Sequence, residues 1–129
     1  MALIHANVFD AALSYIKTNA NEAQVRDASS VELVGSIALN SGNFTGPAAY
    51  SSGSDSGRKI EALTSDSSDM KNIAVTNASG GSAAKIALVN TSGSGTDLIV
   101  ASIASGAVAL GASDAVNLST FDIILKDPA

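Results

Sequence analysis

The sequence KIALVNTSGSGTDLIVASIASGAVAL, residues 85–110, decides the fold. Its short apolar segments are separated by Ser/Gly turns, and similar segments lie before and after it. Each is strand-length, rich in Ile, Val and Leu, and bounded by turn residues. Short strands at regular spacing, with no helical pattern between them, predict an all-β fold, either an antiparallel β-sandwich or a barrel. The strands expected in this half of the chain are Met70–Asn77, Lys85–Thr91, Asp97–Ala104, Ala107–Leu110 and Phe121–Lys126.

Length and composition predict one domain with a thin core. The chain has 129 residues, and we expect residues 1–129 to form a single β-sandwich domain. Alanine dominates the apolar content, Trp is absent, and the aromatic residues are Phe9, Tyr15, Phe44, Tyr50 and Phe121. Because each aromatic side chain buries about 150–250 Å², so few of them build a small core. We therefore expect the protein to form oligomers that bury further surface.

The charge balance argues against several classes of partner. The net charge is −5, and the seven basic residues are scattered along the chain. Nucleic acids and anionic membranes attract clustered Lys and Arg, so neither is an expected partner. There is no cysteine, and no stretch of apolar residues is long enough to span a bilayer. No secretory signal is visible, which predicts a soluble product of the cytoplasm.

The first eighteen residues are expected to form an N-terminal arm and a short helix. Val8, Ala12, Leu13 and Ile16 recur at helical spacing, with Asn7 before them as a candidate N-cap. These residues predict an amphipathic helix over Val8–Thr18. The helix is expected to plug one end or edge of the sheet, or to dock on a partner subunit.

The next part of the chain combines strand candidates with an irregular segment. Ala23–Asp27, Ser30–Leu39 and Arg58–Thr64 are expected strands. Residues 40–57 are dense in Ser, Gly and Asn, and predict a long irregular loop that carries Phe44, Pro47 and Tyr50.

Two late strands have apolar residues on both faces. In Lys85–Thr91 and Asp97–Ala104, apolar side chains occupy odd and even positions alike. A strand with one solvent-exposed face should alternate between apolar and polar residues. The second face should therefore be covered, by the N-terminal helix or by another copy of the protein.

No pattern of residues predicts catalysis, metal binding or a cofactor. His5 is the single histidine and would have to serve any Ser–His–Asp triad or most His-containing metal sites, but no partner pattern lies near it. Asp66 and Asp69 lack the ligand spacing of a calcium loop. Residues 53–59, GSDSGRK, lack the ending of a phosphate-binding loop and run into a predicted strand. We expect a protein that is not an enzyme.

Several short stretches nevertheless occur in a familiar order. They are MALIHANVFDAAL at residues 1–13, GRKI at 57–60, IAVT at 73–76, KIALV at 85–89, LIVA at 98–101 and FDIILKD at 121–127. With them, the chain resembles a family of small structural proteins of tailed bacteriophages. The resemblance covers the first eighteen residues and most of the chain from Gly57 onward, and residues 19–56 lie outside it. The usual form has a Trp near Lys85–Val89, which this chain lacks.

The resemblance implies a virion component that decorates or cements the capsid. Such a protein is expected on the capsid surface, over the junctions between capsomers, with the major capsid protein as its partner. Symmetric positions on the shell suggest a homo-oligomer, a trimer first and a dimer second.

The segments not committed to the predicted sheet are expected to supply the capsid contacts, because such segments tend to carry binding. These segments are residues 1–7 and 40–57. The candidate contact residues in them are Leu3, Ile4, His5, Phe44, Pro47 and Tyr50.

Two other functions remain open. One is a different virion part, such as a head–tail connector, tail or fibre protein, which would share the fold and the lack of chemistry. The other is a module that binds a host surface or a glycan, for which Phe44 and Tyr50 are the candidate aromatic platform.

Overall fold

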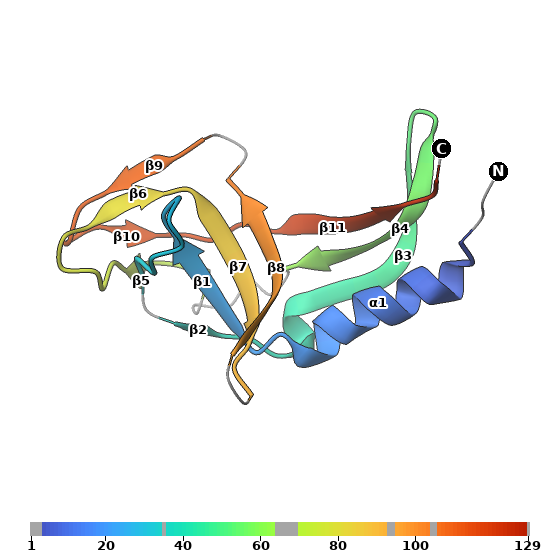
Figure 1. Ribbon diagram of the computed structural model, residues 1–129, viewed down its shortest axis with the longest axis horizontal. Coiled ribbons are helices and arrows are strands. Elements are labelled where there is room, and N and C mark those ends of the chain that lie inside the picture. Colours follow the sequence, from blue (N-terminus) through green and yellow to red (C-terminus); the bar gives the residue numbers. More distant parts are fainter. Residues whose placement is uncertain (1–3, 35, 64–69, 93–94, 104–105, 129) are drawn as a thin grey trace.

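The computed structural model describes residues 4–34, 36–63, 70–92, 95–103 and 106–128. Within these residues the protein is an all-β fold with antiparallel sheets and one N-terminal α-helix (Figure 1). The predicted fold class is therefore confirmed. The helix and a three-stranded sheet form one side of the molecule, and a four-stranded sheet with two small ribbons forms the other (Figure 1).

Helix α1 spans Ala6–Asn19, slightly more than the predicted range. The predicted N-cap was wrong, because His5 holds that position and its Nδ1 accepts a hydrogen bond from the backbone N–H of Asn7 at 3.1 Å. The buried stripe also differs from the predicted one. Phe9 and Leu13 are buried, whereas Val8 is 60% exposed. The helix packs with this stripe against the face of the three-stranded sheet, not against an end or edge.

The four-stranded sheet has the strand order β2-β1-β7-β8. Its strands are β1 (Glu22–Arg26), β2 (Ile37–Ala38), β7 (Lys85–Asn90) and β8 (Thr96–Ser102). One face carries Val25, Ile86 and Ala101, which share a row across the sheet and point toward the interior. The prediction of β7 and β8 from the apolar segments is confirmed.

The opposite face of β7 is covered by polar side chains of the same protein. Arg26 of β1 reaches across β7 to Asp97 of β8, and Ala87 lies between them with 0% exposure. The helix, one of the two expected covers, is therefore not the cover, since it packs on β3 and β4.

The three-stranded sheet has the order β11-β4-β3 and corrects the prediction for residues 40–57. Its strands are β3 (Phe44–Ser52), β4 (Asp55–Ala62) and β11 (Phe121–Lys126). Most of the expected loop is thus a β-hairpin, preceded by a one-turn 3₁₀ helix at Ser41–Asn43. The irregular composition is accommodated by a register shift between Thr45 and Ala48, and Pro47 is tolerated because β3 is an edge strand.

Two small ribbons complete the fold. They are β5 (Ile73–Ala74) with β10 (Ala115–Val116), and β6 (Gly81–Ala83) with β9 (Val108–Leu110). The strands predicted over Ser30–Leu39 and Met70–Asn77 are much shorter than expected. Leu33 and Val34 are nonetheless buried, and Val34 forms an isolated bridge with Val75. One cluster of buried residues connects helix and sheets, and includes Leu13, Leu33, Ile60, Leu88 and Ile123.

Candidate functional site

Three segments far apart in sequence meet at one end of the protein. The β3–β4 hairpin projects there, and the start of α1 and the end of β11 lie beside it (Figure 1). We call this surface the hairpin end and define it as residues 4–8, 50–57 and 126–128. The chain turns at Gly53, whose φ of +59° lies in the left-handed region that glycine adopts readily. Within the hairpin end, the described segment before α1 lies outside the sheets, whereas the segment after β11 stays bound to β4, because the backbone N–H of Asp127 donates to the Ser56 carbonyl at 2.8 Å.

Close packing of strand β11 against the hairpin fixes this geometry. A Cβ atom on Gly57 would lie 2.1 Å from the backbone carbonyl oxygen of Leu125. Only glycine therefore permits the approach of β11 at that point. Tyr50 and Lys126 both pair with Gly57, so the three residues form one row across the sheet.

The charges of the hairpin end and the sheet behind it are paired within the chain. Lys126 Nζ lies 2.6 Å from Asp55 Oδ2, and the Ser56 hydroxyl donates to Asp127 at 2.7 Å. The hydrogen bond to the Asp55 carboxylate raises the pKa of Lys126. Further along β4, Arg58 donates two hydrogen bonds to Asp10 of α1, at 2.6 and 2.9 Å. This last pair ties the helix to the sheet and raises the pKa of Arg58.

The structure brings some of the expected contact residues together and separates others. Ile4 is 40% exposed and His5 is exposed, and both lie at the hairpin end with the half-buried Tyr50. Pro47 is half-buried in the middle of β3. Phe44 is only 4% exposed at the far end of β3, so its proposed surface role was wrong. Leu3 lies outside the described residues.

The residues considered for catalysis, phosphate binding or metal binding have structural roles wherever the structure describes them. His5 caps α1 through Nδ1. Residues 53–59 form a hairpin turn and the start of strand β4, not the loop before a helix that a phosphate site requires. Asp66 and Asp69 lie outside the described residues. Within the described ranges, no group of three or more His, Asp or Glu side chains is placed to hold a metal ion.

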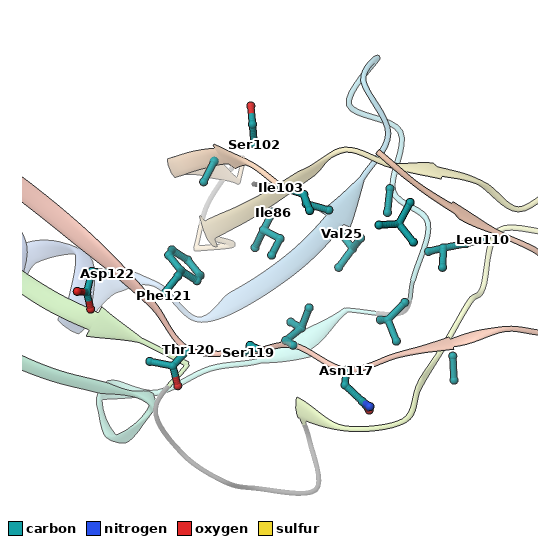
Figure 2. Close-up of a pocket in the computed structure, with 16 residues that line it drawn as sticks. Val25, Ile86, Ser102, Ile103, Leu110, Asn117, Ser119, Thr120, Phe121 and Asp122 are labelled. Atoms are coloured by element: carbon teal, nitrogen blue, oxygen red, sulfur yellow. The ribbon is translucent and has the colours of Figure 1, made fainter. Parts of the chain in front are cut away.

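Sequence reasoning missed an apolar cavity on the other side of the molecule (Figure 2). Its volume is about 650 Å³, and its walls come from β1, β7, β8, the β6–β9 ribbon and residues 115–122. Figure 2 shows Val25 and Ile86 on one wall, Leu110 at one end and Phe121 toward the other. No sequence signal joins these residues, because they belong to segments that only the tertiary fold brings together.

The lining of this cavity is suited to apolar groups and not to acid–base chemistry. Asp122 is its one ionised side chain, and Lys59 Nζ already pairs with that carboxylate at 3.0 Å. Ser102, Ser119 and Thr120 also line it, but the single histidine lies at the start of α1, at the opposite end of the molecule. A serine nucleophile in the cavity would therefore have no histidine base.

Among the described residues, no helix combines the length and the apolar character needed to cross a membrane. Comparison with protein-family models, with curated proteins and with solved structures gave no match.

Proposed function

We propose that the protein is a structural component of a phage virion that binds the outer surface of the capsid as a decoration or cement protein. It acts by mass action. Binding buries surface of this protein and of the capsid subunits only when the shell is assembled, so binding stabilises the assembled shell relative to its free subunits. The major capsid protein is its partner, and the site of binding is the junction between capsomers. The sequence resemblance motivates this proposal, and the hairpin end supplies the contact surface.

The observation that carries the proposal is the convergence at the hairpin end. A projecting hairpin and the segment before α1, which lies outside the sheets, offer adaptable backbone and side chains on a base that the end of β11 holds through Asp127 and Ser56. Loops and termini held by a rigid scaffold are the usual carriers of binding. Ile4 and Tyr50 supply apolar contact area there.

The charges favour a contact that is largely apolar and hydrogen-bonded. Asp55, Arg58 and Lys126 each have a partner in the chain itself, which leaves no strong charged patch at the hairpin end. Raising the salt concentration from about 0.1 to 1 M shortens the Debye length from roughly 10 to 3 Å. We expect this change to release little protein from capsids.

The test uses shells assembled from the major capsid protein of the same phage. Purified protein is mixed with the shells, and the bound fraction is measured by co-sedimentation over a range of concentrations. The double variant Ile4→Ser/Tyr50→Ala should bind at least about tenfold more weakly, which corresponds to about 1.4 kcal/mol. Tyr15→Ala is the matched control, since Tyr15 is 58% exposed on α1 but lies outside the hairpin end.

Two outcomes would contradict the proposal. If the wild-type protein does not bind the shells, but binds tails or connectors of the same phage, it is a different virion part. If the double variant binds shells as well as the wild type does, the hairpin end is not the contact surface.

The fold does not provide the pair of exposed aromatic side chains that the glycan-binding alternative needs. It required Phe44 and Tyr50 together at the surface, and Phe44 is buried in the core. A single half-buried tyrosine offers a sugar little area for stacking.

A further inference from the structure

The apolar cavity of Figure 2 interrupts the packing of the core on one side of the molecule. Ile103, Leu110 and Phe121 line it and pack against the buried core cluster, yet each of them is only half-buried. Protein interiors are close-packed and contain few voids larger than a water molecule. A cavity of about 650 Å³ is far larger than such a void, and it falls within the range of about 300–1,000 Å³ that small-molecule sites occupy.

Polar side chains of the lining turn away from the cavity. Figure 2 shows the polar atoms of Asn117 and Thr120 directed outward, while Ile86 on the facing wall points inward. The Thr120 hydroxyl donates to the Leu63 carbonyl at 3.3 Å, and the Asn117 side chain accepts from a backbone N–H at 2.6 Å. A buried water molecule needs about two to four polar partners. These walls are therefore poorly suited to water and well suited to hydrocarbon.

The charges beside the cavity favour an uncharged ligand. Asp122 is the one ionised side chain among the lining residues. The nearby ammonium group of Lys59 lies 3.0 Å from the Asp122 carboxylate and 3.5 Å from that of Glu61, so two carboxylates already share it. Burying an anionic group without a cation to pair with it is costly. A ligand with a buried carboxylate or phosphate is thus disfavoured.

The walls also favour a small hydrocarbon over a segment of another protein chain. Strands β1, β7 and β8 turn one face of their sheet to the cavity, through the row Val25, Ile86 and Ala101. Backbone hydrogen-bonding groups lie in the plane of a sheet, whereas side chains stand on its faces. A peptide in the cavity would bury its own N–H and C=O groups against apolar side chains, at a cost in free energy. A hydrocarbon has no such groups to satisfy.

We propose that this cavity binds an uncharged, largely hydrocarbon molecule, such as a medium-chain alcohol or a weakly polar aromatic compound. A cavity of about 150 Å³ holds a benzene molecule, so this one has room for roughly 20 non-hydrogen atoms. The ligand lies between the sheet and residues 115–122, with Leu110 at one end and Phe121 toward the other (Figure 2). Removal of these walls from water drives the binding. The inference goes beyond the proposed capsid contact and does not rest on it.

Fluorescence titration with N-phenylnaphthylamine, an uncharged probe whose emission rises in apolar surroundings, measures this binding. The wild type should bind one probe per chain with a dissociation constant of about 1–100 μM. Ala101→Phe adds a ring to the cavity wall and should raise this constant at least about tenfold. Ala109→Phe is the matched control and should bind like the wild type, because Ala109 is exposed on β9 and is not a lining residue. Circular dichroism shows whether each variant retains the fold.

Competition tests the expected class of ligand. Decanol and decanoate have chains of the same length and differ in the charge of the head group. Decanol should displace the probe at a lower concentration than decanoate, because the cavity offers the carboxylate no unshared cation.

The absence of Trp allows a measurement that locates the ligand. Val108→Trp places a single tryptophan at the rim of the cavity, where Val108 is 46% exposed. Bromine quenches tryptophan fluorescence only at close range. Undecanol with bromine at the end of its chain should therefore quench this tryptophan at the concentrations that displace the probe. Ala109→Trp, one position along the same strand and outside the lining, should be quenched no more than free tryptophan.

Every measurement uses the purified protein alone, so its outcome is separate from that of capsid binding. The inference is overturned if the wild type binds no probe, or if folded Ala101→Phe binds it like the wild type. Equal displacement by decanoate and decanol would contradict the uncharged class, and equal quenching of the two tryptophans would place the ligand elsewhere. If the wild type excludes the probe and sediments as a dimer that Ala101→Phe dissociates, a second copy fills the cavity instead.

Discussion

The Arg26–Asp97 pair provides a quantitative test of how the four-stranded sheet is held together. Arg26 Nη1 and Nη2 each donate to one oxygen of Asp97 at 2.8 Å, and Nε donates to Gln24 Oε1 at 2.9 Å. The side chain crosses the whole width of β7 and covers Ala87. The pair therefore joins β1 to β8 on the solvent face without backbone contact between these two strands.

The expected magnitude follows from geometry and exposure. A hydrogen bond to a charged group contributes about 1.5–3 kcal/mol, whereas a fully exposed ion pair contributes about 0–1 kcal/mol. The Arg26 side chain is 11% exposed but that of Asp97 is 45% exposed, so water screens the pair substantially. We expect a coupling free energy of about 1 kcal/mol between the two side chains. Arg26→Ala should cost about 1 kcal/mol more than Arg26→Met, because alanine also removes the aliphatic cover of Ala87.

Urea unfolding of Arg26→Met, Asp97→Asn and the double variant measures this coupling as a double-mutant cycle. The two changes should be non-additive, since either one alone removes the interaction. A coupling below about 0.3 kcal/mol, within the usual additivity of independent sites, would refute the argument.

The pH dependence gives a second, independent measurement. The hydrogen bond from Arg26 lowers the pKa of Asp97 below its ordinary value of 3.8. A carboxylate with a lowered folded-state pKa contributes stability that is fully present above the unfolded value and is lost as the pH falls through the folded value. The difference in unfolding free energy between wild type and Asp97→Asn should therefore be constant above about pH 5 and should shrink below about pH 4. A difference that grows on acidification would contradict the assigned sign.

Further predictions concern the three-stranded sheet and its core. Ile60→Ala should lower the free energy of unfolding by about 2–5 kcal/mol in a urea titration, because Ile60 is 0% exposed between the sheet and α1. A loss below about 1 kcal/mol would show that the surrounding side chains fill the space or that the helix does not cover this residue. Gly57→Ala should be more destabilising than Gly53→Ala in the same assay, since a Cβ at Gly57 would meet the Leu125 carbonyl at 2.1 Å while nothing lies within 4 Å at Gly53. Equal effects of the two glycine changes would mean that backbone conformation, and not the approach of β11, sets the cost.

The strands with a strong local signal were predictable from sequence. Phe121–Lys126 has the predicted bounds, and β7 and β8 begin and end within two residues of the expected positions. These segments contain consecutive Ile, Val and Leu between turn residues, so local composition and tertiary environment favour the same state.

The β3–β4 hairpin was not predictable in the same way. Strand β3 reads FTGPAAYSS, with small and turn-forming residues in most positions. Its strand conformation depends on pairing with β4 and on the cover that α1 provides, which are tertiary effects.

The same distinction between local sequence signals and tertiary effects applies to the candidate sites. Ile4 and His5 could be placed at the surface because they precede a helix with a clear periodicity. The cavity and the hairpin end could not be predicted, because the hairpin end joins segments more than forty positions apart and the cavity joins Val25 to several separate segments between residues 83 and 122. Phe44 was misplaced because an aromatic residue in a polar stretch gives no local sign of the core into which it folds.

The pairing of β4 with β11 has a consequence for synthesis of the protein. Strand β4 ends at Ala62, and its partner β11 begins at Phe121, about 60 residues later. At about 5–20 residues per second, a ribosome needs roughly 3–12 s to add that stretch. During this interval the nascent hairpin has one vacant edge, and Ile60 lacks its neighbour Ile123. The emerging chain is therefore most vulnerable to aggregation in these seconds, when binding of a chaperone to the hairpin would protect it.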